Sequence, residues 1–271
     1  VGEAAVRERL HHVVHRVHVE RPRRVLAVGG DEHDDGAVQQ LPPEREARHR
    51  LQRRSHVVHV RVRLDGLQLV PQLAGHGTAM EDMIPTRWAD WTRDADAAYA
   101  RLASRAKKIV VLGLSMGGSL TLWVGTQHPE VKGLVCVNPA TLPQPQEVID
   151  MLKGMVDGGQ EVMDGIGSDI ADPSTHETAY PGTPLAALHS FQVDGLVPLS
   201  KKYGELKMPL LLFTSVQDHV VDPGNSDALA AAYGGPVDRV MLERSYHVAT
   251  QDYDKDTIFA ASVEFISRVT A

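Results

Sequence analysis

Residues 107–118 read Lys-Lys-Ile-Val-Val-Leu-Gly-Leu-Ser-Met-Gly-Gly, a β-branched run that enters a glycine-rich turn. The apolar half is typical of a buried strand. The turn carries Gly-x-Ser-x-Gly and leads into a helix-compatible segment, a pattern that places Ser115 at a sharp strand-to-helix reversal. We expect Gly113 and Gly117 to be required there, because the reversal brings neighbouring backbone too close for a Cβ atom. Ser115 is then presented as a nucleophile.

Strand and helix signals alternate from about residue 69 onward, as in a parallel sheet flanked by helices. The predicted strands are 109–112, 133–137, 209–215 and 239–243. A helix is expected over 116–128. A terminal helix is expected over 255–269, with Asp252 or Asp254 near its start. One stripe of this helix would be buried: Ile258, Ser262, Phe265, Ile266 and Val269. Together with the serine turn, this order predicts the α/β class and the α/β-hydrolase fold, with a mostly parallel sheet.

Residues 142–205 interrupt the alternation with many prolines and glycines. We interpret them as a small cap inserted over the mouth of the site, which leaves residues 1–141 and 206–271 as the core. Five apolar residues of the cap are candidates to line an acyl pocket, or alternatively to pack the cap on the core: Leu185, Leu188, Phe191, Leu196 and Val197.

The bulk properties exclude several classes of protein. A chain of 271 residues can bury one large core plus a small insertion. Its apolar runs fall short of the roughly 18 residues of a membrane span, so we expect no stable membrane insertion and a cytoplasmic location. The single cysteine, Cys136, lies in a predicted strand and is expected to be buried. The formal net charge is −7, and no basic stretch is interleaved with aromatic residues, which argues against a nucleic-acid partner.

Residues 1–73 differ in composition from the remainder. They hold 13 arginines and 8 of the 14 histidines, but no aromatic Phe, Tyr or Trp and no Ile. Such a segment is poorly equipped to supply a core. Strands are conceivable over 25–28 and 57–64. His11, His15 and His18 recur at helical spacing, but no carboxylate or cysteine completes a site, so we expect a surface stretch and no metal. The same excess of Arg, His and Val would result from a GC-rich coding region translated out of frame.

A serine nucleophile needs a histidine base and a carboxylate that orients the histidine. In this fold they follow the serine in the order acid, then histidine, at the ends of later strands. Asp218 follows the strand 209–215, and His247 follows the strand 239–243. We therefore expect Asp218 and His247 to be the partners of Ser115.

Four other residues compete for these roles. Asp222 precedes a proline and is better placed to end the loop. His219 adjoins Asp218, and neighbouring side chains in a turn seldom face each other. His128 falls at a predicted helix end. His76, within Gly75-His76-Gly77, lies in a loop that could line the site, and we expect it to have a structural role.

Four blocks of sequence together resemble the bacterial monoacylglycerol lipase and carboxylesterase family over roughly residues 69–271. These blocks are Gly113-Leu114-Ser115-Met116-Gly117-Gly118, Gly75-His76-Gly77-Thr78 with Asp90-Trp91, Asp218-His219-Val220-Val221, and Ser245-Tyr246-His247-Val248. The resemblance implies a triad of Ser115, Asp218 and His247, with the Met116 amide as one oxyanion donor. It also implies that Glu177, in Glu177-Thr178-Ala179-Tyr180, contacts the glycerol hydroxyls of the substrate. A solvated cap carboxylate is the alternative for Glu177.

One element of the family is missing. Relatives place a His-Gly-aromatic motif about thirty residues before the Gly-His-Gly loop, where it supplies the second oxyanion amide. Arg45-Glu46-Ala47 occupy that region here, and Gly29-Gly30 is a distant substitute.

The sequence thus predicts a serine esterase that hydrolyses monoacylglycerols or other short- to medium-chain carboxylic esters without a cofactor. The alternatives are a hydrolase of another bond type on the same fold, and a weakly active or inactive relative with an incomplete oxyanion hole.

Overall fold

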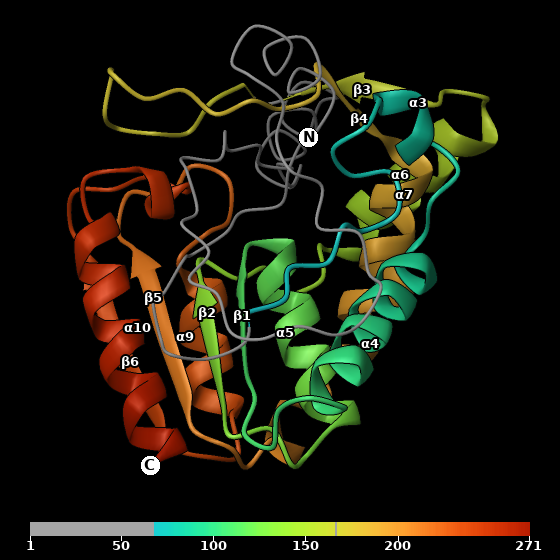
Figure 1. The fold of residues 1–271 in the computed structure, drawn as a ribbon. Helices are drawn as coiled ribbons and strands as arrows, with labels where there is room; N and C mark the ends of the chain where they lie inside the picture. Colours follow the sequence, from blue (N-terminus) through green and yellow to red (C-terminus); the bar gives the residue numbers. More distant parts are fainter. Residues whose placement is uncertain (1–67, 166) are drawn as a thin grey trace, which may run out of the picture.

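The computed structural model describes residues 68–165 and 167–271 (Figure 1). The expectations for residues 25–28, 57–64, His11, His15 and His18, and for the oxyanion loop near Arg45 or Gly29, lie outside these residues.

A parallel four-stranded sheet forms the centre of the described part of the chain, in the order β1-β2-β5-β6. All four predicted strands are present, with ends shifted by at most two residues: β1 (Val110–Leu114), β2 (Gly133–Val137), β5 (Leu210–Ser215) and β6 (Val237–Leu242). β1 runs two residues further than expected because its pairing with β2 continues to Leu114, which lies opposite Val137. Gly113, the first glycine of the serine motif, is therefore a strand residue.

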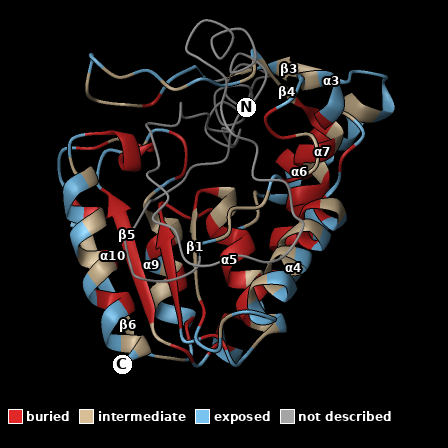
Figure 2. Ribbon diagram, in the orientation of Figure 1, coloured by how far each residue is buried: buried red, intermediate tan, exposed pale blue. Residues whose placement is uncertain are grey.

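Helices cover both faces of this sheet (Figures 1 and 2). The long ones are α4 (Trp88–Ala103), α5 (Met116–Gln127), α9 (Gly224–Ala232) and α10 (Lys255–Thr270). Alternate strand residues face opposite ways, so Leu134 and Leu212 pack with Leu122 of α5, whereas Val135 and Phe213 pack with α10. The predicted stripe of the terminal helix is confirmed for Ile258, Ser262, Phe265 and Ile266, which are buried, whereas Val269 is only partly buried.

The residues between β2 and β5 form smaller elements outside the main sheet. They are α6 (Gln146–Asp157), β3 (Val162–Asp164), β4 (Gly182–Pro184), α7 (Leu185–Ser190), the π-helix η2 (Phe191–Leu196), α8 (Val197–Leu199) and the 3-10 helix η3 (Tyr203–Glu205). β3 and β4 form an antiparallel pair. We call residues 142–205 the inserted segment; their treatment as a cap on a core of residues 1–141 and 206–271 stays a prediction.

The described strands end at one edge of the sheet, and the loops that follow them converge there. Ser115 follows β1, Asn138 follows β2, and Asp218 and His247 lie in the loops after β5 and β6. The long loop between β3 and β4 crosses the same end of the molecule, at the top of Figure 1. The short elements α3 (Met80–Met83) and η4 (Ala249–Gln251) complete the described chain.

Two further expectations concern burial and membranes. Cys136 is fully buried in β2, and burial raises the pKa of its thiol. None of the helices in residues 68–165 and 167–271 combines the length and the apolar character that a bilayer crossing requires.

Candidate active site

Ser115 occupies a strained turn between β1 and α5. Its backbone φ and ψ are 55° and −122°, a combination that side-chain-bearing residues rarely adopt. The main chain is held on both sides: Ser115 N–H donates to the Val137 carbonyl at 3.0 Å, and the Ser115 carbonyl accepts from the amides of Gly118, Ser119 and Ala140. These bonds fix the turn through the backbone, and with it the direction in which the side chain of Ser115 leaves the main chain.

The glycines of the motif have unequal roles. A Cβ on Gly113 would lie 1.9 Å from the Gly117 carbonyl oxygen, and one on Gly118 would lie 2.6 Å from the Pro139 side chain. A Cβ on Gly117 would meet no described atom within 4 Å. The expectation that both flanking glycines are sterically required is correct for Gly113 and wrong for Gly117, because the close approach falls on Gly113 and Gly118 instead.

The start of α5 presents a backbone donor next to Ser115. Met116 is the first residue of this helix, and the leading amides of a helix have no partner within it. No described residue accepts a hydrogen bond from the Met116 amide. The helix dipole adds a partial positive charge at this end. The arrangement suits a negative oxygen beside Ser115.

Asp218 and His247 are brought together by the loops after β5 and β6. Asp218 Oδ2 lies 2.7 Å from His247 Nδ1, and both side chains are almost completely buried, at 2% and 0% exposure. The other carboxylate oxygen, Oδ1, accepts the amides of Val220 and Val221 at 2.8 and 2.9 Å. Because the carboxylate accepts a hydrogen bond from Nδ1, the single N–H hydrogen of the neutral imidazole lies on Nδ1. Nε2 is left as a buried acceptor without a hydrogen-bond partner among the described residues.

The loop that carries His247 is held by carboxylates. Asp254 Oδ2 accepts the amides of Arg244 and Ser245, at 3.0 and 2.9 Å. Asp252, which is fully buried, accepts the Tyr246 amide at 2.9 Å. Asp254 stands at the cap position of α10, near the start of the helix as expected, but its carboxylate makes no cap bond and is engaged by the loop.

Asn138, directly after β2, supports the same loop. Its side chain donates to the His247 carbonyl at 2.8 Å and to Ser215 Oγ at 2.9 Å, and it accepts the Ser215 amide at 2.7 Å. Its φ is 44°, a left-handed conformation that asparagine tolerates better than most residues. Sequence reasoning missed Asn138, although an asparagine directly after a buried strand was the available signal.

The competing residues lie elsewhere. Asp222 is exposed, and its carboxylate accepts the Gly224 amide at 2.7 Å. His128 ends α5, where Nε2 contacts Asp96 at 2.6 Å and the ring stacks on Tyr99. His219 turns away from Asp218, as expected, and pairs with Asp169 on the inserted segment.

His76 is buried in the loop before α3. Nδ1 contacts the Ala74 carbonyl at 3.0 Å, and the ring meets the Trp91 ring edge-on. Burial lowers the pKa of His76 from 6.5 to about 4, against the smaller opposing effects of the Ala74 carbonyl and Asp94. The ring is therefore neutral in the folded protein near pH 7, in keeping with a structural role.

The lowered pKa of His76 predicts an acid-dependent loss of stability. Between pH 6.5 and about 4 the unfolded chain binds a proton that the folded chain does not, so the free energy of unfolding falls as the pH falls. The contribution over the whole interval is about 3 kcal/mol. His76→Asn retains a donor for Ala74 and should flatten this acid limb in urea unfolding at pH 7.5 and 5. The exposed His176→Asn is the control, and equal acid sensitivity in wild type and His76→Asn would contradict the assignment.

Glu177 lies on the loop between β3 and β4. Glu177 is half-buried, both of its carboxylate oxygens are shielded from solvent, and its role stays a prediction. Three residues further on, the Tyr180 hydroxyl donates to the Gly75 carbonyl at 2.9 Å and accepts the Thr78 amide at 3.0 Å. This part of the inserted segment is thereby joined to the Gly-His-Gly loop.

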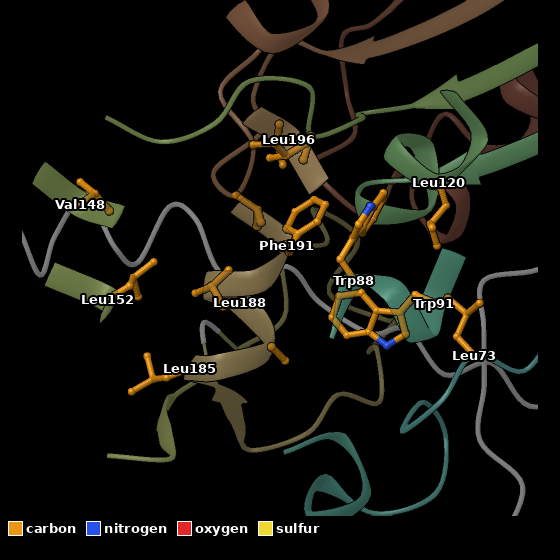
Figure 3. Packing of buried hydrophobic residues seen from close by; sticks show 14 residues of the cluster. Leu73, Trp88, Trp91, Leu120, Val148, Leu152, Leu185, Leu188, Phe191 and Leu196 are labelled. Carbon is orange, nitrogen blue, oxygen red and sulfur yellow. The ribbon is translucent and has the colours of Figure 1, made fainter. Parts of the chain in front are cut away.

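The apolar residues of the inserted segment pack against α4 (Figure 3). Phe191 lies beside Trp88, with ring centroids 5.5 Å apart, and Leu185, Leu188 and Leu196 belong to the same buried cluster. Val197 is only partly buried. For the first four candidates the structure favours packing of the segment on the core over the lining of an acyl pocket.

The order of strands, the serine turn and the buried Asp218–His247 pair agree with a known family. Residues 70–254 match the family model of the Hydrolase_4 family, described as serine aminopeptidase, S33. The chain belongs to this family. A thermostable monoacylglycerol lipase from Bacillus sp. (strain H-257) is 39% identical over 203 residues, which cover 73% of this chain and 78% of that protein.

Two further comparisons agree with this membership. A carboxylesterase from Bacillus subtilis (strain 168) is 24% identical over 204 residues, covering 73% of this chain and 80% of that protein. A structure reported for the metagenome-derived lipolytic enzymes LipS and LipT superposes with a TM-score of 0.66 at 35% identity, over 73% of this chain and 80% of that one. The α/β-hydrolase fold, the resemblance to bacterial monoacylglycerol lipases and carboxylesterases, and the class of carboxylic ester hydrolase are confirmed.

Proposed function

We propose that this protein is a serine esterase that hydrolyses monoacylglycerols or other short- to medium-chain carboxylic esters. Ser115 is the nucleophile, His247 the base and Asp218 the residue that orients it. The observation that carries the proposal is the buried pair of Asp218 Oδ2 and His247 Nδ1 at 2.7 Å, which leaves Nε2 as the acceptor. A histidine in this state takes a proton from a serine hydroxyl, and Ser115 follows β1 at the same edge of the sheet.

The reaction follows from this placement. His247 Nε2 removes the hydroxyl proton of Ser115 as Oγ attacks the ester carbonyl, and Asp218 stabilises the imidazolium. The negative charge on the carbonyl oxygen is held by the Met116 amide at the start of α5. The imidazolium then protonates the departing alcohol, which leaves an acyl group on Ser115. Water, deprotonated by His247, attacks this ester, and the carboxylic acid is released. No step calls for a cofactor.

The substrate class is supported by the similar proteins and by the inserted segment. The relative at 39% identity is a monoacylglycerol lipase, and the LipS and LipT enzymes are described as lipolytic. Glu177 is proposed to contact the glycerol hydroxyls, as the resemblance to monoacylglycerol lipases implies, because a carboxylate is a strong acceptor for hydroxyl donors. The positions expected for a second oxyanion donor lie outside the described residues.

A fluorophosphonate probe tests the proposal directly. The probe reacts only with an activated serine, and we expect mass spectrometry to find it on the peptide that contains Ser115. The labelled enzyme should lose hydrolysis of 1-monodecanoylglycerol in proportion to labelling. Absence of labelling on active, folded protein, or labelling of another serine, would contradict the triad.

Amide hydrolysis is the second candidate function, because the family is described as serine aminopeptidase. Matched substrates separate the two activities: a p-nitrophenyl ester and a p-nitroanilide that carry the same acyl group. We expect the ester to be cleaved far faster. A higher kcat/KM for an aminoacyl anilide than for any monoacylglycerol would assign the peptidase activity instead.

A further inference from the structure

We propose that Asp169, on the inserted segment, is a positioning residue that holds the backbone of His247 in the place from which it acts as a base. This proposal rests on the proposed function. It gives the inserted segment a part in the chemistry, in addition to any contact with the substrate.

Asp169 joins the two loops that carry the partners of Ser115. Its Oδ2 accepts the amide of His247 at 3.0 Å and the amide of His219 at 3.2 Å. Its Oδ1 lies 2.8 Å from His219 Nδ1, and its carbonyl accepts the Val248 amide at 3.2 Å. The residue is buried, with 8% exposure. One carboxylate thus binds the residue that follows Asp218 and the proposed base itself.

The contacts on His247 come from two sides. Asp169 accepts its amide, while Asn138, on the end of β2, donates to its carbonyl at 2.8 Å. Asp169 therefore binds both peptide groups of His247, through the amides of His247 and Val248, and Asn138 binds the His247 carbonyl from the sheet. Removal of Asp169 leaves a buried amide without its acceptor, and the loop is expected to shift to satisfy it.

The segment that carries Asp169 is itself fixed. Asp252 accepts the amides of Ala171 and Asp172, at 2.7 and 3.0 Å, with the same carboxylate that accepts the Tyr246 amide. The loop between β3 and β4 is therefore tied to the His247 loop at two neighbouring points. These bonds hold Asp169 in place, and a fixed Asp169 in turn limits the movement of the His247 backbone.

The consequence for catalysis is geometric. His247 must keep Nδ1 at 2.7 Å from Asp218 while Nε2 meets the hydroxyl of Ser115. A displacement of about 1 Å in such an arrangement costs on the order of 100-fold in rate. Asp169 binds His247 through its backbone amide and not through its imidazole, so the effect of Asp169 should appear in the chemical step and leave substrate binding largely intact.

Two substitutions at this position separate anchoring from charge. Asp169→Ala removes the acceptor for both amides. In Asp169→Asn the amide oxygen can still accept from the backbone amides of His247 and His219, because both bond to a single oxygen. The new NH₂ group faces His219 Nδ1, which can accept from it in the tautomer that carries the ring hydrogen on Nε2. Asp172→Ala is the matched control: this carboxylate lies in the same loop and bonds only within it, to Ser174 and Thr175.

The test measures the rate of fluorophosphonate labelling, kcat and KM, thermal stability, and the downfield proton resonance of the His247–Asp218 hydrogen bond. In Asp169→Ala we expect labelling and kcat to fall by about 10- to 100-fold, with KM changed by less than about threefold and the resonance lost or broadened. Asp169→Asn and Asp172→Ala should stay within about threefold of wild type and keep the resonance.

The outcomes are distinct from those of the proposed function. If wild-type protein is not labelled at Ser115, the esterase proposal fails. If wild type is labelled and folded Asp169→Ala reacts as fast, only the role of Asp169 is overturned. Should Asp169→Ala fail to fold, Asp169→Asn decides: a loss beyond about 30-fold would overturn the proposal, because the anchoring oxygen is retained.

Discussion

Ser115→Ala is expected to abolish ester hydrolysis, with kcat lowered by about 10⁴- to 10⁶-fold. Without the hydroxyl no acyl-enzyme forms, and the residual rate comes only from the oxyanion donor and from substrate binding. Thermal stability should stay nearly unchanged or rise, because the turn is held by the main chain of Ser115 through bonds that alanine retains. The measurement is the hydrolysis of 1-monodecanoylglycerol, beside a thermal melt and fluorophosphonate labelling.

Ser119 provides the matched control for this variant. It lies one turn further along α5, is fully buried, and donates from Oγ to the Ala140 carbonyl at 2.5 Å. Ser119→Ala should lower stability by about 1 kcal/mol while leaving labelling of Ser115 intact. Turnover retained in Ser115→Ala would end the assignment of the nucleophile and would indicate a serine selected only because it fits the turn.

The elements that carry the site could be predicted because they depend on local pattern. The run 107–118 combines a β-branched strand with a glycine turn, and the alternation of strands and helices fixes the order of the later loops. Since parallel strands end at one edge, Asp218 and His247 could be placed together without a structure. His219 could be excluded as a partner for Asp218 by the same local reasoning, and the structure turns it to Asp169.

The supporting contacts could not be predicted because they join distant segments. Asp169 meets the His247 amide across 78 positions in the chain, and nothing in its neighbourhood distinguishes it from Asp164 or Asp172. The role of Asp252 likewise depends on the path of the inserted segment. For Gly117 the prediction itself was wrong. Its place in the motif suggested that a Cβ atom would not fit there, but the close contacts that exclude a Cβ atom occur at Gly113 and Gly118.

The apolar residues of the inserted segment illustrate a limit of composition. Leu185, Leu188 and Phe191 suit an acyl pocket and a packed interface equally well, since both bury apolar surface. The choice is made by Trp88 and Trp91 of α4, which meet them in one cluster. The cytoplasmic location stays a prediction.

Asp218→Asn is expected to lower kcat by about 10⁴-fold, and Asp222→Asn to have little effect. The hydrogen bonds of Asp218 explain why. Its Oδ1 accepts the amides of Val220 and Val221, so the oxygen of an asparagine takes that place and its NH₂ group is directed to His247 Nδ1. The imidazole must then accept at Nδ1 and carry its hydrogen on Nε2, the tautomer that is unable to take a proton from Ser115.

Asp222→Asn is the matched control because the change in charge and shape is identical four residues away. Asp222 is exposed, and its contact with the Gly224 amide survives in an asparagine. Both variants should fold, so kcat, the rate of fluorophosphonate labelling and the downfield Nδ1 proton resonance report on the site alone. The resonance should vanish in Asp218→Asn and persist in Asp222→Asn. A larger loss of kcat in Asp222→Asn would assign Asp222 as the acid in place of Asp218. Equal losses of kcat in both variants would show that the contact between Asp218 and His247 does not decide which carboxylate orients the histidine.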